Sequence, residues 1–418
     1  MTEMDKAINA PDAGAAPDAE SARDTEPGDF GVEQTTLYMG PQHPATHGVL
    51  QIILTLEGEK IVRAEPVVGF LHRGKEKHGE ELNYTQYITF TDRLDYCSSM
   101  ANNIGYALAV ENLLGIECTE RCQYFRVIIA ELTRIASHLI WLGTSAIDLG
   151  AITIYFYTFK EREDIYDIFD QITGLRMNNM FVRFGGMGGD IRPDVADRIR
   201  KFTDDFPKTL DTCETLLTRN RIWWQRTRDV AVISKEDAID LGLTGPNLRG
   251  SGVEYDLRKD NPYLCYDEID FDVPYGEEGD AYDRYLVRME EMRQSVRIIR
   301  QAIDAMPEGP VFTDEARKYI LPPKNRVYES MEELIHQFKI VTDLRLPVGQ
   351  VYKATEVPKG ELGFFIDSRG GQSAYRMRIR SPSFTNLQAL PKMAEGRLLA
   401  DMTSIIGSLD FVMGEVDR

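Results

Sequence analysis

The chain has 418 residues, of which 43% are hydrophobic and 28% charged, so it can bury a sizeable core in one large domain or two intimate ones. Its formal net charge of -19 argues against a general affinity for nucleic acid or anionic lipid, because both require clustered Lys and Arg. The five cysteines are odd in number and include no C-x-x-C pair, which argues against disulfides and a cysteine-ligated metal site.

A membrane-spanning helix and a targeting sequence are not expected. The most apolar stretch, residues 127–159, is interrupted by titratable side chains, which are Glu131, Arg134, His138 and Asp148. The N-terminus has neither an apolar core segment nor an Arg-rich amphipathic pattern, so it resembles neither a secretory signal nor a mitochondrial presequence. We therefore expect the chain to stay in a bacterial cytoplasm.

Residues 1–34 form a segment of distinct composition. They are rich in Ala, Asp, Glu and Pro, and carry nine acidic residues against Lys6 and Arg23. Such a segment cannot bury enough apolar surface to fold. We predict a disordered acidic tail at 1–34 and one folded domain at 35–418.

Three strands open the predicted domain, at residues 36–39, 49–56 and 60–68. The loop between the first two, residues 40–48, contains two prolines and two glycines, which stiffen the backbone and allow a tight reversal. His43 and His47 are thus predicted at the tip of a rigid hairpin. The pattern alone leaves a solvated turn equally open.

A basic connector at 70–77, which includes Arg73, leads into an apolar segment at 83–114 whose later part is typical of a helix buried on nearly all sides. At its outer end, residues 92–96 combine Asp92, Arg93, Asp95 and Tyr96. Charged groups are expensive to bury unless paired. Either Tyr96 lines a buried chemical site or the segment is an exposed first turn with an Arg–Asp pair.

The next predicted helix, 121–145, carries a polar stripe of Glu131, Arg134 and His138. A histidine in such a stripe is more often a satisfied structural residue than a ligand. Asp148 follows in a mainly apolar stretch of sequence, so it needs a buried partner or a helix end to cap. A histidine or an arginine would be the natural partner.

The rest of the chain is predicted to be mainly helical. Helices are expected at 154–173, 192–218, 285–306, 331–341 and 387–406, and strands at 349–353, 363–368 and 375–379. A glycine-rich loop at 184–190 should let backbones approach closely, and 266–283 is predicted to be an irregular acidic and aromatic surface segment. The fold class is α+β, mainly α.

Five long motifs then occur in one order: Gly-Pro-Gln-His-Pro-Ala-Thr-His-Gly (40–48), Leu-His-Arg-Gly-x-Glu-Lys (71–77), Asp-Arg-Leu-Asp-Tyr (92–96), Tyr-Asp-Glu-x-Asp-Phe-Asp-Val-Pro (266–274) and Gly-Asp-Ala-Tyr-Asp-Arg-Tyr (279–285). Residues 356–361 and 380–384 continue the match. Together they resemble the quinone-site subunit, also called the D subunit, of the proton-pumping NADH:quinone oxidoreductase, respiratory complex I. The resemblance covers essentially everything after the acidic tail.

That family is related to the large subunit of nickel-iron hydrogenases, whose metal is held by two C-x-x-C pairs. The resemblance implies a hydrogenase-large-subunit-like helical core with a small N-terminal antiparallel sheet and a C-terminal mixed β segment. It places the lost cysteines at Asp95, Ser98, Val412 and Glu415, which cannot replace four thiolates around a soft metal. No metal is expected.

The resemblance also implies a quinone headgroup site. His47 and Tyr96 would donate hydrogen bonds to the two quinone carbonyls, and Asp148 would pair with His47. Other residues would line or support the pocket: His43, Thr46, Asp95, Ser98, Val412, Arg73 and His138.

The chain would bind no cofactor of its own. Electrons would arrive from an iron-sulfur cluster in the adjacent subunit, other peripheral-arm subunits would surround the chain, and a membrane subunit would form the quinone channel. The chain would lie on the cytoplasmic side of the bacterial inner membrane, and quinone reduction would be coupled to proton translocation. Two alternatives stay open: a metal-free structural scaffold, and a hydride-handling metalloenzyme, which the missing cysteines nearly exclude.

Overall fold

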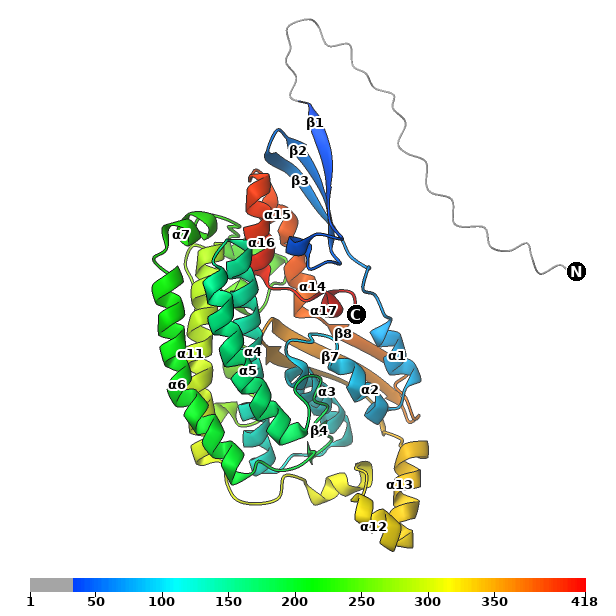
Figure 1. Ribbon diagram of the computed structural model, residues 1–418. Helices are drawn as coiled ribbons and strands as arrows, with labels where there is room; N and C mark the ends of the chain where they lie inside the picture. The colour runs from blue at the N-terminus through cyan, green and yellow to red at the C-terminus, as the bar shows by residue number, and fades with distance from the viewer. Residues whose placement is uncertain (1–32) are drawn as a thin grey trace, which may run out of the picture.

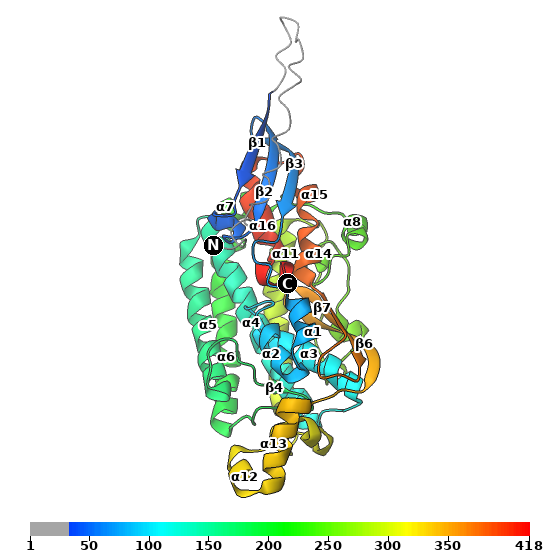
Figure 2. The ribbon, with the colours of Figure 1, turned by 90° about the vertical axis from the view of Figure 1, so that its right-hand side faces the viewer.

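The structure, a computed structural model, describes residues 33–418. The predicted tail at 1–34 therefore lies almost entirely outside the described residues. Four long helices run side by side as a bundle (Figures 1 and 2): α4 (Glu120–Asp148), α5 (Ile152–Thr173), α6 (Pro193–Leu217) and α11 (Ala281–Ala305). One small sheet lies beyond the end of the bundle, and a second lies along its side (Figure 1).

The N-terminal sheet confirms the predicted strands. It consists of β1 (Gln34–Met39), β2 (Gln51–Glu57) and β3 (Lys60–Val67), paired antiparallel in that order. Ile52, Leu54 and Leu56 alternate with more exposed residues along β2, as expected for a strand with one buried face. β1 begins at Gln34, which the sequence had assigned to the tail.

Residues 83–114 form two helices instead of one. They form α2 (Tyr84–Thr91) and α3 (Ser99–Leu114), separated by an irregular link at 92–98. The link interrupts the helix because the Asp95 carboxylate accepts hydrogen bonds from the N–H of Cys97 and the hydroxyl of Ser98, a local alternative to helical bonding. Residues 92–96 lie at the outer end of α3, as predicted, but outside the helix, so they are not its first turn. The prediction of a nearly all-round buried helix was right for α3.

The helices of the bundle agree with the sequence pattern. Among residues 33–418, α4 alone is long and apolar enough to span a membrane, yet 89% of its most apolar window is buried inside the protein. Its polar stripe is buried too, because Arg134 and Arg258 pair with Glu131. α11 begins four residues earlier than predicted, since Asp280 caps it by accepting from the N–H of Asp283 at 2.7 Å.

Two very short strands pair at the glycine-rich loop: β4 (Val182–Arg183) directly precedes it, and β5 (Gly186–Met187) lies within it. Gly186 forms a backbone β-bridge with Phe312, and the N–H of Thr313 donates to the carbonyl of Gly185 at 3.1 Å, so the predicted close approach of backbones is present. Residues 266–283 are irregular apart from a short 3-10 turn and the start of α11. They are not simply a surface segment, because Tyr266 and Phe271 are buried.

The second sheet pairs β6 (Val348–Val357), β7 (Gly360–Arg369) and β8 (Arg376–Arg380) antiparallel. All three predicted strands are present, although β6 and β7 are longer than expected. Pro358 and Lys359 form the tip of the β6–β7 hairpin, a turn that the sequence analysis did not identify. α3 packs against β6 and β7.

The predicted helix at 387–406 was wrong. The segment holds the end of α14 (Pro382–Leu387), α15 (Leu390–Ala394) and the start of α16 (Met402–Leu409). The chain leaves the helix because Gly396 has φ +78° and its N–H donates to the carbonyl of Ile61 at 2.8 Å. Residues 396–397 thus pair with β3 instead of continuing the helix.

The remaining helical elements are short, apart from α13, which confirms the helix predicted at 331–341. They are η1 (Pro44–Thr46), α1 (Lys75–Glu81), α7 (Arg221–Thr227), α8 (Lys235–Asp240), α9 (Pro246–Arg249), α10 (Leu257–Asp260), η2 (Tyr266–Glu268), η3 (Asp314–Tyr319), α12 (Lys324–Glu329), α13 (Met331–Asp343), η4 (Leu399–Asp401) and α17 (Met413–Val416).

Candidate functional site

The loop between β1 and β2 is held by its own hydrogen bonds. The Nδ1 atom of His43 accepts from the N–H of Ala45 at 3.2 Å. The buried hydroxyl of Thr46 lies 3.3 Å from the carbonyl oxygen of Pro41 and 3.0 Å from that of His43. His47 follows with φ 56°, a conformation uncommon for residues other than glycine. Thr46 thus closes the loop, which presents two exposed histidines.

The link between α2 and α3 holds Tyr96 beside a buried carboxylate. Asp95 is fully buried and lies 2.6 Å from the hydroxyl of Ser98, while the side-chain amide of Asn102 donates to the Asp95 carbonyl at 2.9 Å. Tyr96 is 41% exposed. Desolvation, together with the charges of Cys97 and Asp95, raises the pKa of Tyr96 to about 12. The phenol therefore keeps its proton at neutral pH and can donate a hydrogen bond.

The C-terminal segment 410–414 contacts both loops. The ring of His47 packs on that of Phe411, with centroids 5.0 Å apart. A Cβ added to Gly414 would lie 3.5 Å from Cδ1 of Tyr96 and 2.8 Å from the carbonyl oxygen of Leu94. His47 and Tyr96, 49 positions apart in the sequence, therefore flank the same short segment.

Lys75 connects the 92–98 link to the C-terminal segment 410–414. Its buried ammonium donates to the carbonyl oxygens of Gly414, at 2.6 Å, and of Arg93. Desolvation lowers the pKa of Lys75 to about 8, opposed by Glu415. The connector at 70–77 is thus more than a polar linker. Arg73, predicted at the pocket, is exposed.

The charges around His47 differ from the predicted pair. Partial desolvation lowers the pKa of His47, Asp410 raises it and Lys359 lowers it. Asp148 is the last residue of α4 and is exposed. Partial desolvation raises the pKa of Asp148, and His43 lowers it. In this structure the neighbouring charge that acts on Asp148 is that of His43, and the pairing of Asp148 with His47 stays a prediction.

The four positions assigned to the lost hydrogenase cysteines are all buried: Asp95, Ser98, Val412 and Glu415. The hydroxyl of Ser383 donates to the Glu415 carboxylate and accepts from the N–H of Val412 at 3.4 Å. Burial, together with the charge of Asp95, raises the pKa of Glu415 to about 7. Burial also raises the pKa of Asp95. The charge of Asp95 is thus one of the causes that raise the pKa of Glu415, so these two buried carboxyl groups influence each other.

Sequence reasoning missed Lys359 and Asp410. Both are buried, and Nζ of Lys359 lies 2.5 Å from Oδ2 of Asp410. The motif at 356–361 pointed to the family, but a lysine between Pro358 and Gly360 is typical of a solvated turn. The role of Lys359 becomes visible only in the structure, where the tip of the hairpin is buried.

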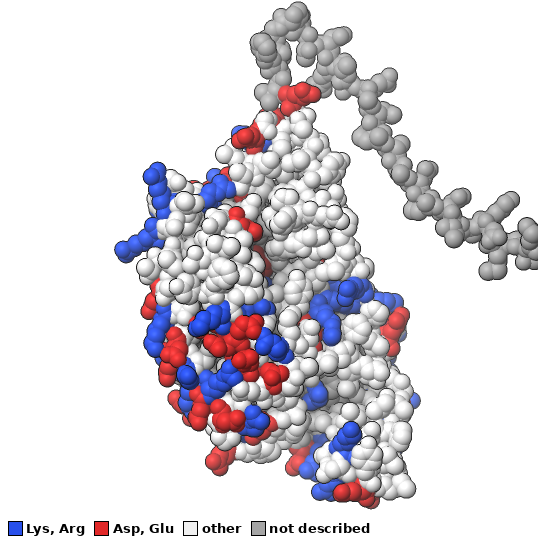
Figure 3. Space-filling view, viewed as in Figure 1, with Lys and Arg blue, Asp and Glu red and all other residues white. Residues whose placement is uncertain are grey.

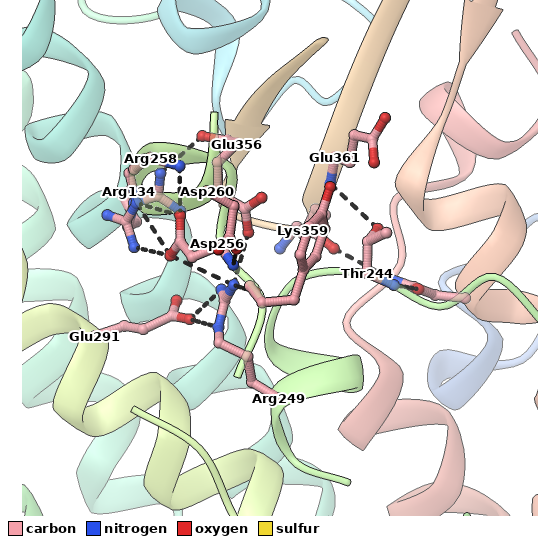
Figure 4. Close-up of polar contacts among 12 residues, drawn as sticks. Arg134, Thr244, Arg249, Asp256, Arg258, Asp260, Glu291, Glu356, Lys359 and Glu361 are labelled. Atoms are coloured by element: carbon pink, nitrogen blue, oxygen red, sulfur yellow. Dashed lines mark hydrogen bonds and ion pairs between the residues drawn. The ribbon is translucent and has the colours of Figure 1, made fainter. Parts of the chain in front are cut away.

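A buried ion network extends from this region into the bundle (Figure 4). Arg249 binds Glu291 and lies 2.9 Å from Glu356. His138, predicted to support the pocket, has Nε2 2.8 Å from Glu291, and both side chains are fully buried. Desolvation lowers the pKa of His138, although the bond to Glu291 raises it. His138 is therefore a buried core residue bonded to Glu291 through Nε2, while its buried Nδ1 has no hydrogen-bond partner among the described residues.

Comparison with known proteins gives a consistent answer. Residues 148–418 match the family model described as the 49-kDa subunit of respiratory-chain NADH dehydrogenase. The chain is 54% identical to the D subunit of NADH-quinone oxidoreductase from Geotalea uraniireducens over 92% of this chain and 99% of that protein. It is 51% identical to the D 1 subunit of NADH-quinone oxidoreductase from Opitutus terrae over 97% of this chain and 96% of that protein.

Proposed function

Because the chain belongs to the family of the 49-kDa, or D, subunit of NADH-quinone oxidoreductase, we propose that it forms the quinone headgroup site of that complex. The observation that carries the proposal is that His47 and Tyr96, both exposed, flank the single segment 410–414. Two donors on either side of one surface can hold the two carbonyl oxygens of a flat ring.

The chemistry of quinone reduction needs such donors. A quinone that accepts two electrons becomes a dianion unless it is protonated, so donors at both oxygens stabilise the developing charge. The Tyr96 phenol is protonated at neutral pH, with its pKa raised to about 12 by desolvation and neighbouring charges. Desolvation lowers the pKa of His47, and we propose that Asp148 pairs with His47 when quinone is bound and so favours its protonated form.

The electrons come from outside the chain in this proposal, from an iron-sulfur cluster of an adjacent subunit. The quinone site would be the remnant of a hydrogenase-like metal site that has lost its thiolate ligands. Other peripheral-arm subunits complete the surroundings, and quinol formation drives proton translocation. The chain itself binds no cofactor.

The surface supports contact with a membrane subunit that holds the quinone tail. Figure 3 shows few charges over β1–β3 and the adjoining ends of α4 and α5. Large apolar side chains are exposed there, including Ile147, Ile152 and Phe156. An exposed apolar face of this kind is typical of a protein or membrane interaction site. The chain would then sit peripherally on the cytoplasmic side of the bacterial inner membrane.

Photo-affinity labelling of the assembled complex with a quinone analogue tests the proposal. The label should fall on peptides containing residues 40–48, 92–98 or 410–414, and excess quinone should prevent it. Labelling confined to other subunits would contradict the proposal and favour the alternative, a structural scaffold that holds iron-sulfur and membrane subunits together.

A further inference from the structure

The β6–β7 hairpin buries a lysine at its tip. Lysines are rarely buried, and loop tips generally face solvent, yet Lys359 is 3% exposed. The tip is held in place from two sides. The side-chain amide of Asn386 donates to the carbonyl oxygen of Lys359 at 3.0 Å, and a Cβ added to Gly360 would lie 2.5 Å from Oγ1 of Thr244. Figure 4 shows Lys359 and Glu361 of this hairpin beside Thr244.

The ammonium of Lys359 meets one carboxylate directly. Its Nζ lies 2.5 Å from Oδ2 of Asp410, and Nε of Arg288 lies 3.8 Å from the same oxygen. Asp410 directly precedes Phe411, on whose ring His47 packs. A buried ion pair is weak evidence for stability, because apolar side chains of similar volume can often replace it. Its place beside His47 therefore calls for another explanation.

We propose that Lys359 and Asp410 form a positioning pair of the quinone site, which holds one fixed positive and one fixed negative charge beside His47 and so decides whether His47 carries a proton when quinone is reduced. This inference rests on the proposed function and deepens it. Lys359 need not touch the quinone, because it acts through Asp410 and through its field at His47.

The two charges act on His47 in opposite directions. After desolvation, which lowers the pKa of His47, the main charges are Asp410, which raises it, and Lys359, which lowers it. Other groups surround the pair from the 92–98 link, α4, α11 and α17: Asp95, Cys97, His138, Arg288 and Glu415. Removal of Lys359 alone leaves Asp410 as the main charge acting on His47, although Arg288 still lies near Asp410, so His47 should hold its proton to higher pH.

The test measures NADH:quinone turnover against pH in assembled complexes. Lys359→Met should move the limb that belongs to His47 to higher pH by about one unit, and Lys359→Arg, which keeps the charge, should restore the original profile. The double variant Lys359→Met with Asp410→Asn removes both charges and should return the limb toward its original position. If Lys359→Met does not assemble, Lys359→Gln removes the charge while still donating to Asp410, and the same shift is expected.

A matched control is Lys392→Met. Lys392 also forms an ion pair of 2.5 Å, with Asp237, but its side chain is 54% exposed, so its loss should leave the profile unchanged. An unchanged limb in both Lys359→Met and Lys359→Gln would overturn the inference, as would the same shift in a His47→Gln background. Quinone labelling separates the positioning pair from the proposed function. Label at residues 40–48 with no shift of the pH limb would contradict only the positioning pair, whereas no label anywhere in this chain would contradict the proposed quinone site.

Discussion

Tyr96 combines two properties that a hydrogen-bond donor to quinone needs. Its ring is partly exposed beside Gly414, and desolvation with neighbouring negative charge raises its pKa to about 12. Its partial exposure makes the phenol accessible. Its raised pKa would keep the proton on the phenol until the proposed quinone carries charge.

Tyr96→Phe should therefore lower quinone reduction without changing the packing or assembly of the protein. The ring and its packing remain, but one donor is lost, so we expect quinone reduction to fall tenfold or more, which corresponds to about 1.4 kcal/mol or more of lost transition-state stabilisation. Electron transfer from NADH to an artificial upstream acceptor should not change. Tyr328→Phe, on a side chain that is 79% exposed on α12, serves as the control. Quinone turnover within about twofold of wild type would contradict the donor role.

Asp148 tests whether the predicted pair with His47 forms during turnover. An ionised carboxylate near an imidazole favours the imidazolium, so Asp148→Asn should lower turnover and move the acidic limb of the pH profile to lower pH. The shape of the side chain is kept, so assembly should not change. Asp170→Asn, at an exposed position of α5, provides the comparison. Identical rates and pH profiles for wild type and Asp148→Asn would rule the pair out.

The elements that carry the site were only partly predictable from the sequence. Alternation found β2, and three- and four-residue spacing found α3 and α4, because each buries one periodic face. The break at 92–98 was missed, since the apolar residues continue on both sides and only the bonds of Asp95 stop the helix. The break in the predicted helix at 387–406 was missed for a similar reason, because β3 supplies the competing partner for Gly396.

A buried ion pair links α3 to α4, beside their apolar contacts. Nη1 and Nη2 of Arg126 lie 2.8 Å and 2.6 Å from the two carboxylate oxygens of Glu111, and Glu111 also accepts from the N–H of Gly185 at 2.7 Å. The pair thus joins two core helices to the glycine-rich loop.

Arg126→Met should destabilise the chain by about 3–5 kcal/mol, because it leaves Glu111 charged and buried. We expect little assembled complex and a lower temperature of thermal inactivation. Arg300→Met removes a half-exposed pair with Asp204 at 2.8 Å and should cost about 0–1 kcal/mol. Equal recovery of the two variants would show that the buried pair is not needed.

At the scale of the whole molecule, the site is built where three distant parts of the chain meet. The 40–48 loop, the 92–98 link and the C-terminal segment come together around Phe411 and Gly414. The motifs identified the first two parts and the resemblance assigned Val412 and Glu415. The sequence could not show that Lys359 turns inward to join them, because burial of a hairpin tip depends on what packs over it, here Thr244 and Asn386.

The residues that meet there decide which chemistry the site can support. Of the four positions assigned to hydrogenase cysteines, Val412 has no donor atom in its side chain, and the carboxylate of Asp95 already binds the hydroxyl of Ser98 at 2.6 Å. Glu415 is engaged by Ser383. Nickel in a hydrogenase-like site prefers soft thiolate ligands. These oxygen groups are hard and few, and both oxygens of Asp95 and one of Glu415 are already hydrogen-bonded.

We therefore expect purified complex to contain no stoichiometric nickel, even when cells grow with added nickel. Elemental mass spectrometry of the complex measures this directly, with a nickel-iron hydrogenase purified by the same protocol as the positive control. Iron is no guide, because the proposed iron-sulfur subunits contribute it. Stoichiometric nickel that disappears in Asp95→Asn or Glu415→Gln would show that these carboxylates bind a metal, and the site would then be that of a metalloenzyme instead of a quinone pocket.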